Sequence, residues 1–443
     1  MTSPLRTFLL PACAWVLASH LDAQPGLRYT AADPHETLMT VTHVQVPSKV
    51  YNTARDVSVW LPSGLPKTGV RYVVLVFPDA EEKTQFRAAL ANIQFLIDRG
   101  LVPPIMVLGV PFLANRMHEL SPSATGTTAQ QFPQAGGADE TLQFYADELL
   151  PWADAHYPTL PTRILAGHSL GGLIALHAMV TRPDVFRIVI AMSPAVYWND
   201  GAFSKQAAAS LAADTRRERT LFLTSGGLEV GGLQGRIDIA TTTFTDQLHA
   251  ALDSTHNTTL RVERRTYPKD EHDVTPMASL VDGLRMAFEP IIVPIDSVFL
   301  QLSNNHIEDS ATIHQVTRDL ESRYTTAAKS LGIPTPFPEA PLDALGSYSL
   351  SVKHTGLATI LFRENLDHYP HSANAHESLG EALAATGDTT RAVAELRTAV
   401  TIGEAEMRGT NSILVWANDR DIIAAARSQL HQLHHDSPAS SGS

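Results

Sequence analysis

Residues Gly167–Gly171 read Gly-His-Ser-Leu-Gly and fit the pattern G-x-S-x-G. This pattern is typical of a serine held on a sharp turn between a strand and a helix, where its hydroxyl is exposed. A short apolar run at 162–166 precedes the turn, and apolar residues at helical spacing follow it: Leu173, Ile174, Leu176 and Met179. A glycine-rich helix start capped by a serine is the alternative interpretation. The flanking strand and helix favour a nucleophile, so we expect Ser169 to attack an acyl carbon.

A serine hydroxyl becomes an effective nucleophile only when a neighbouring base accepts its proton. In the fold that carries this turn, the chain order is serine, acid and then histidine. His272 follows the last expected strand, on a loop that could return to Ser169, so we expect it to be the base. An exposed loop histidine is the alternative. His168 adjoins the nucleophile too closely, His177 falls within the next helix, and His256 precedes the last strand.

The acid should follow the strand before the last one, and its role is to hold the imidazole in the correct tautomer. Glu229 is the first carboxylate after the expected strand at 221–225, so it is the expected acid. Asp238 is the second candidate, and a solvated loop is the alternative interpretation. Asp270 and Asp273 lie too near the histidine in sequence to orient it in the usual way.

The negative charge that develops on the substrate oxygen needs two backbone N–H donors. One should be the amide of Leu170, and the other should lie in the loop 77–81, where we choose Ala80. Arg116 is a candidate to bind a substrate carboxylate or carbonyl, with a structural ion pair as the alternative. Trp198 is a candidate wall of the substrate pocket, with core packing as the alternative.

Length, composition and charge limit the classes of protein that fit. The 443-residue chain is 44% hydrophobic and 18% charged, which is ordinary for a globular protein of two or more domains. Its formal net charge of −13 argues against nucleic acid as a partner, because phosphate binding favours a basic surface. No basic amphipathic stretch indicates a helix on a membrane surface, and we expect no membrane span.

Residues 1–23 resemble an export signal, because Arg6 precedes the largely apolar segment Phe8–Leu17 and a cut before Gln24 is compatible with the sequence. The expected location is therefore secreted or periplasmic, and a buried N-terminal helix is the alternative. Cys13 is the only cysteine, so removal of the signal would leave a chain without disulfides or thiolate chemistry.

Strand-like and helix-like segments alternate before residue 290. The strands are expected at 40–46, 57–61, 72–77, 105–110, 162–166, 187–192, 221–225 and 259–267. The helices are expected at 84–98, 138–157, 170–181, 241–253 and 277–288. This alternation predicts an α/β class protein with an α/β-hydrolase fold and a mostly parallel eight-stranded sheet. The Ser169 turn follows the fifth strand, where that fold carries its nucleophile.

The sequence after residue 290 changes to an all-helical pattern with an internal repeat. Leu345-Gly346 recurs 34 residues later as Leu379-Gly380, and Ala358 and Phe362 recur at the same offset as Ala392 and Leu396. This period is typical of tetratricopeptide repeats, which are helix pairs. Two pairs and a final helix near 419–433 are marginal as a free-standing solenoid, so we expect them to pack on the preceding domain or on another subunit.

These patterns give expected boundaries along the whole chain. They are a signal peptide at 1–23, a hydrolase domain at 24–290, a helical linker at 291–341, a small all-α tetratricopeptide-like domain at 342–435 and a disordered tail at 436–443. His431, His434 and His435 lie near the end of the last helix, and we interpret them as solvent-facing rather than as a metal site.

Several segments resemble the esterase family of α/β hydrolases that includes enterochelin esterases and esterase D. They are Arg116–Pro122, Gly136–Ala138, Glu148–Trp152, Gly167–Gly172, Ser193–Trp198, and His272 with Val274 and Pro276. The resemblance covers roughly 55–290 and implies ester hydrolysis by Ser169, His272 and an acid, for which we carry over Glu229, with no metal or other cofactor. The loop Pro78-Asp79-Ala80 departs from the Asp-Gly that is common there. Family members with an appended tetratricopeptide-like region resemble the whole chain.

Three hypotheses follow for the activity. The first is an esterase acting on a small-molecule or siderophore-like ester. The second is an acyl transferase, because the same acyl-enzyme step serves both reactions. The third is a non-catalytic protein whose repeats recruit a protein partner or a second copy of the chain.

Overall fold

The computed structural model describes residues 40–63, 70–229, 235–255, 257–304, 309–333, 336–409 and 413–436. The expected signal peptide and the tail after residue 436 lie outside these residues, so the export signal stays a prediction. Within the described residues, no single helix is both long and apolar enough to cross a membrane. The segments Thr275–Ile291 and Ile295–Ser303 satisfy that test only jointly, across a 43° bend.

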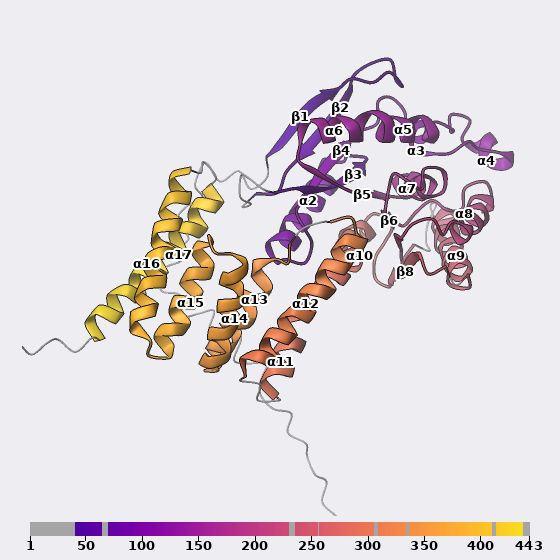
Figure 1. Ribbon diagram of the computed structural model, residues 1–443. Helices are drawn as coiled ribbons and strands as arrows, with labels where there is room; N and C mark the ends of the chain where they lie inside the picture. The colour runs from indigo at the N-terminus through magenta and orange to yellow at the C-terminus, as the bar shows by residue number, and fades with distance from the viewer. Residues whose placement is uncertain are drawn as a thin grey trace, which may run out of the picture. The chain divides into compact units, whose positions relative to one another are not determined.

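Eight strands form one sheet in the order β1-β2-β4-β3-β5-β6-β7-β8 (Figure 1). They are β1 (Val41–Val46), β2 (Arg55–Trp60), β3 (Tyr72–Pro78), β4 (Ile105–Val110), β5 (Thr159–His168), β6 (Ile188–Met192), β7 (Arg219–Gly226) and β8 (Leu260–Tyr267). β2 pairs antiparallel with β1 and β4, and the other neighbours pair parallel. The predicted mostly parallel sheet of an α/β-hydrolase fold is therefore confirmed.

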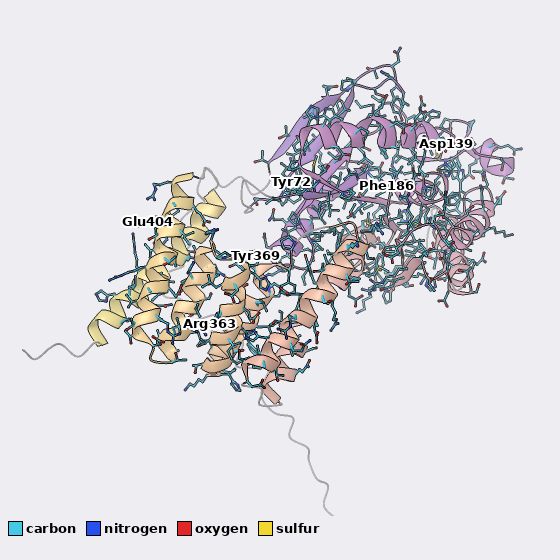
Figure 2. All side chains as sticks on the ribbon, in the orientation of Figure 1. Tyr72, Asp139, Phe186, Arg363, Tyr369 and Glu404 are labelled. Carbon is cyan, nitrogen blue, oxygen red and sulfur yellow. The ribbon has the colours of Figure 1, made fainter. Side chains whose placement is uncertain are left out.

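The central strands are apolar throughout because helices cover both faces of the sheet. On β6, Val189 and Ala191 belong to the core cluster that includes helix α7 (Leu170–Thr181), whereas Ile190 faces Gly283 of helix α10 (Thr275–Phe288). Each fully buried aliphatic side chain contributes roughly 1.5–3 kcal/mol. Side chains fill the sheet domain in the same way around Phe186, which is 1% exposed (Figure 2).

The remaining helices of the sheet domain are α2 (Lys83–Asp98), α3 (Arg116–Leu120), α4 (Gly126–Gln131), α5 (Ala138–Phe144), α6 (Leu150–His156), α8 (Ala202–Ala213) and α9 (Gly235–Asp253). The helix expected at 138–157 is interrupted, because a π turn, Tyr145–Leu149, separates α5 from α6. Pro151 follows this turn and lacks the N–H that a continuous α-helix would donate to an earlier carbonyl. Helix α8 was not predicted.

The C-terminal part is all-helical. From α13 to α17 each helix packs on the next, whereas α11 contacts α13 and α12 contacts α14 (Figure 1). After the short η2 (Glu289–Ile291) come α11 (Ile295–Asn304), α12 (Ser310–Ser330), α13 (Glu339–Ser351), α14 (Thr355–His368), α15 (Ala373–Ala385), α16 (Thr389–Gly409) and α17 (Ile413–Asp436). A Cβ on Gly346 would lie 2.5 Å from Phe362, and one on Gly380 would lie 2.7 Å from Leu396. The predicted repeat thus places a glycine of one helix against a large side chain of the next in both pairs. Assignment to the tetratricopeptide class and the domain boundaries stay predictions.

Candidate active site

The Ser169 turn has the strained backbone that its sequence pattern predicts. β5 ends at His168, α7 begins at Leu170, and Ser169 between them has φ 58° and ψ −114°. A Cβ on Gly167 would lie 2.3 Å from the Gly171 carbonyl oxygen, so only glycine fits there. The turn is held because the Ser169 amide donates to the Met192 carbonyl at 2.9 Å.

The start of α7 and the loop after β3 lie against one another. As the first residue of the helix, Leu170 has an N–H without an intrahelical acceptor, as an oxyanion donor requires. A Cβ on Gly171 would lie 3.2 Å from the Asp79 carboxylate, which places this loop beside the helix start. Ala80 follows Asp79 and is buried against Gly109. The two predicted donors therefore come from neighbouring segments, and their role stays a prediction.

Glu229 is a buried carboxylate in a turn directly after β7. Its Oε1 atom accepts hydrogen bonds from the Ser193 hydroxyl at 2.5 Å and the Gly226 amide at 2.6 Å, and the Thr275 hydroxyl lies 3.4 Å away. These donors fix the orientation of the carboxylate, so its second oxygen, Oε2, is directed elsewhere.

Oε2 of Glu229 faces Nδ1 of His272 at a distance of 3.5 Å. This distance exceeds that of an ordinary hydrogen bond, but both atoms are buried and neither has another partner. Buried polar atoms without a partner are uncommon, so each atom is the natural partner of the other. The His272 side chain is 16% exposed, which leaves its other edge accessible.

The surroundings of Glu229 favour its ionised form. Burial by itself raises the pKa of a carboxyl, but the interactions of Glu229 with His272, Ser193 and the Gly226 amide outweigh it and lower its pKa. Glu229 is therefore charged at neutral pH and can hold an N–H of His272. The alternative acid, Asp238, lies in α9, but its side chain falls outside the described residues, as does His256.

Arg116 is engaged by Asp79. Its Nε and Nη2 atoms donate to the two carboxylate oxygens at 2.5 and 2.7 Å, and Nη2 also approaches the His168 carbonyl at 3.4 Å. This bidentate pair corresponds to the ion-pair alternative, and it ties the loop after β3 to the end of β5. A substrate-binding role for Arg116 stays a prediction.

Trp198 is fully buried. Its indole N–H donates to the Pro122 carbonyl at 3.1 Å, and its ring stacks on Phe132 with centroids 5.5 Å apart. These contacts match the core-packing alternative, so a pocket-wall role stays a prediction.

The same region connects two loops that follow β4 and β6. The Thr125 amide donates to the Asn199 side chain at 2.8 Å, and the Asn199 amide group donates back to the Ser123 carbonyl at 3.1 Å. The Thr127 hydroxyl donates to Asp200 at 2.6 Å. The segments 120–134 and 198–200 therefore form one hydrogen-bonded unit, which we call the paired loops.

Two titratable residues near the turn received no role from the sequence. The ring of His168 lies 4.4 Å from that of His272, and burial together with the charges of His272 and Arg116 lowers the pKa of His168 to about 3. Glu81 lies two residues after Asp79, and burial together with the Asp79 charge raises its pKa to about 7. His168 belongs to the turn itself, whereas Glu81 lies in the loop after β3, which the fold places beside the start of α7. His177 instead pairs with Asp139 at 2.7 Å.

A cavity of about 550 Å³ lies at the other edge of the sheet. Its lining includes Arg71, Pro104 and Leu160, which lie at the amino ends of β3, β4 and β5, together with Ile333 and Tyr369. Leu160, near the start of β5, and Ser169, directly after its end, are nine positions apart, which is roughly 30 Å at 3.3 Å per residue. This cavity is therefore separate from the candidate active site.

Part of this chain is similar to known esterases. A family model described as Putative esterase matches residues 48–266. The siderophore triacetylfusarinine C esterase of Aspergillus fumigatus is 47% identical over 66 residues, 14% of this chain and 23% of that relative. The siderophore enterobactin esterase of Emericella nidulans is 33% identical over 118 residues, 23% of this chain and 39% of that relative. The chain thus matches less than half the length of these two curated relatives.

A solved structure of an IroE-like serine hydrolase from Shewanella oneidensis shares the fold. It is 20% identical with a TM-score of 0.59, and the match covers 74% of this chain and 100% of that one. The family match contains the Ser169 turn, the strands that flank it and Glu229. Residues 48–266 therefore match the Putative esterase family, within a chain that has an α/β-hydrolase fold.

Proposed function

We propose that this protein is a serine esterase that hydrolyses carboxylic esters through an acyl-enzyme on Ser169. The observation that carries the proposal is the pair formed by Glu229 and His272. Its two facing atoms are 3.5 Å apart, buried and without other partners, and both residues follow Ser169 in the expected order.

In this mechanism each residue has a separate task. With Nδ1 directed at Glu229, His272 presents Nε2 as the base that accepts the Ser169 proton and later returns it to the leaving alcohol. The charged Glu229 stabilises the imidazolium. The Ser169 oxygen forms the acyl-enzyme, and the Leu170 amide at the start of α7 stabilises the oxyanion. Water then attacks the acyl carbon, with His272 again as the base.

The names of the relatives support siderophore esters as the substrate class, since two of them are siderophore esterases. An ester cleaved in this way releases an acid and an alcohol without any redox step. We therefore propose that the substrates are small molecules and that p-nitrophenyl esters will serve as generic probes.

The first experiment compares p-nitrophenyl butyrate hydrolysis by wild type and Ser169→Ala. Removal of a nucleophile lowers kcat by several orders of magnitude, so we expect a loss of at least about 10³-fold. Ser347→Ala is the matched control, because Ser347 is an exposed serine within α13. Equal hydrolysis by wild type and Ser169→Ala would refute the proposal.

A second experiment identifies the reactive atom and the reaction. A fluorophosphonate should modify wild type at the peptide containing Ser169 and leave Ser169→Ala unmodified, as mass spectrometry can determine. Product analysis with enterobactin, and with an added alcohol as acceptor, then separates hydrolysis from acyl transfer. A linear acid as the main product supports hydrolysis, whereas a new ester supports transfer.

A further inference from the structure

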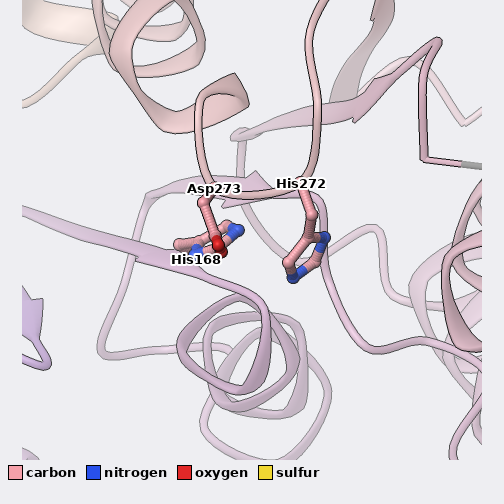
Figure 3. Close-up of side chains that lie close together, drawn as sticks. All are labelled: His168, His272 and Asp273. Atoms are coloured by element: carbon pink, nitrogen blue, oxygen red, sulfur yellow. The ribbon is translucent and has the colours of Figure 1, made fainter. Parts of the chain in front are cut away.

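Three potential metal ligands lie together beside the Ser169 turn: His168, His272 and Asp273 (Figure 3). One ligand atom of each residue lies within 4.8 Å of those of the other two. His168 is the last residue of β5, whereas the other two belong to the loop between β8 and α10. Two imidazoles and one carboxylate form a set that Zn²⁺ binds well, with water at the fourth position.

The hydrogen bonding of the two histidines leaves one ring nitrogen of each available to a metal ion. Nε2 of His168 is buried and has no hydrogen-bond partner, so burial removes its hydration without compensation. Nδ1 of His272 faces Glu229, which leaves Nε2 as the nitrogen that His272 can offer. In protein zinc sites, a carboxylate commonly holds the far nitrogen of a ligating histidine in this way.

We propose that His168, His272 and Asp273 form a zinc site through which Zn²⁺ inhibits the enzyme. The inhibition rests on the function proposed above, because zinc would occupy the lone pair of His272 that must accept the Ser169 proton. Metal and proton therefore compete for one atom. Binding itself requires only the three ligands and is independent of catalysis.

The site can reach zinc geometry by a local adjustment. Donor atoms that lie 2.0–2.1 Å from a tetrahedral zinc are about 3.3 Å from one another, so the three ligands must move closer. Asp273 is exposed, so its side chain has room to rotate toward the two histidines. The nearby guanidinium of Arg116 donates two hydrogen bonds to the Asp79 carboxylate. The negative charge of Asp79 reduces the repulsion between Arg116 and a bound metal ion.

The binding test uses the full-length Ser169→Ala protein, so that no turnover intervenes. Zinc affinity is measured by competition with a chromophoric chelator, and we expect one ion per chain. His168→Gln and Asp273→Asn, each added to Ser169→Ala, should weaken binding at least tenfold. Asp273 is exposed, so that variant remains informative if His168→Gln fails to fold.

The matched control replaces His431, His434 and His435 with alanine in the same background. These histidines are the other candidate metal cluster in the sequence, and their replacement should leave the affinity unchanged. Unchanged affinity in Asp273→Asn, or loss of affinity in the triple variant, would overturn the proposed site.

The inhibition test measures p-nitrophenyl butyrate hydrolysis by wild type at increasing zinc, with reversal by a chelator. Relative to its own metal-free rate, Asp273→Asn should need at least tenfold more zinc for half inhibition. If Ser169→Ala binds zinc but wild type hydrolyses no ester, the proposed function fails and the metal site stands. If wild type hydrolyses esters without zinc binding, the metal site fails and the function stands.

Discussion

The two ends of the parallel strands differ in which residues carry a left-handed backbone. At the carboxyl ends, the neighbouring strands β3, β5 and β6 are each followed by a non-glycine residue with positive φ. These residues are Asp79 (60°), Ser169 (58°) and Ser193 (41°). A Cβ in this conformation costs about 1–2 kcal/mol, so this edge of the sheet is strained at three adjacent positions.

At the amino ends, positive φ occurs on glycine. Gly100 has φ 64° and lines the cavity, and Gly332 has φ 71° and adjoins Ile333 in the lining. Glycine adopts this conformation without a Cβ penalty, so this edge meets the same geometric need without strain.

The three strained positions at the carboxyl ends all carry side chains that glycine could not supply. Asp79 binds Arg116, Ser193 donates to Glu229, and Ser169 is the candidate nucleophile. Glycine at any of the three positions would relieve the backbone strain, but it would remove the side chain that makes the contact or, at Ser169, the candidate nucleophile. Backbone strain at the carboxyl ends of the strands therefore coincides with the candidate active site. At the amino ends, glycine provides the same positive φ without strain.

The largest expected effect is on activity at the carboxyl edge. Glu229→Gln keeps the shape of the side chain but cannot stabilise the His272 imidazolium, so kcat/KM for p-nitrophenyl butyrate should fall about 10³- to 10⁴-fold. Ile333→Val at the amino edge, where Ile333 is fully buried, should cost about 1 kcal/mol of stability and leave kcat/KM of the folded protein within twofold. Similar activity losses in both variants would remove the distinction between the edges.

The next effect concerns the two kinds of glycine. Gly167→Ala places a Cβ 2.3 Å from backbone at the Ser169 turn, so unfolding by denaturant should show a loss of about 3 kcal/mol or more. Gly100→Ala meets nothing within 4 Å and should lose only about 1 kcal/mol through its positive φ. Equal losses would show that close packing at the turn is not what requires Gly167.

A smaller effect depends on pH. The pKa of Glu81 in the folded protein is raised to about 7, above the pKa of the same carboxyl in the unfolded chain. The folded protein therefore loses stability as the pH rises from the unfolded-state pKa toward 7. Glu81→Gln removes this titration, so the stability of the variant relative to wild type should increase by about 2 kcal/mol between pH 5 and pH 8. Denaturant unfolding at both pH values measures it, with exposed Glu82→Gln as the control for net charge. A pH-independent difference would contradict the assignment.

The smallest effect measures the strain itself. Ser169→Gly should be more stable than Ser169→Ala by about 1 kcal/mol, because only alanine keeps the Cβ in the left-handed conformation. At Ser347, exposed in the middle of α13, the order should reverse, because glycine disfavours a helix. Thermal unfolding of the four variants tests both signs, and the same order at the two positions would argue against strain at Ser169.

The predictions from sequence succeeded where local pattern determines structure. All eight strands lie near their expected positions, and α7 spans the predicted 170–181, because apolar runs and glycine spacing are local signals. Glu229 and His272 face one another as the expected chain order implies, although their catalytic roles stay predictions.

The sequence did not predict contacts between distant segments. Arg116 and Asp79 are 37 positions apart, and Ser193 and Glu229 are 36 apart, so no local pattern joins them. Helix α8 was missed because its alanine-rich sequence has a weak amphipathic pattern. The π turn between α5 and α6 was missed because the apolar pattern continues through it as in one helix. The turn lets the chain accommodate Pro151, which has no N–H to donate.

The paired loops determine what could be exchanged between enzymes built on this scaffold. Thr125 and Asn199 are 74 positions apart in sequence but share a hydrogen bond, and Trp198 is tied to Pro122. A graft of either loop alone would leave the amide of Thr125, the side chain of Asn199 and the indole N–H of Trp198 to find new partners. The two loops are therefore one structural unit made of two separate segments, and a graft has to carry both segments to keep these hydrogen bonds.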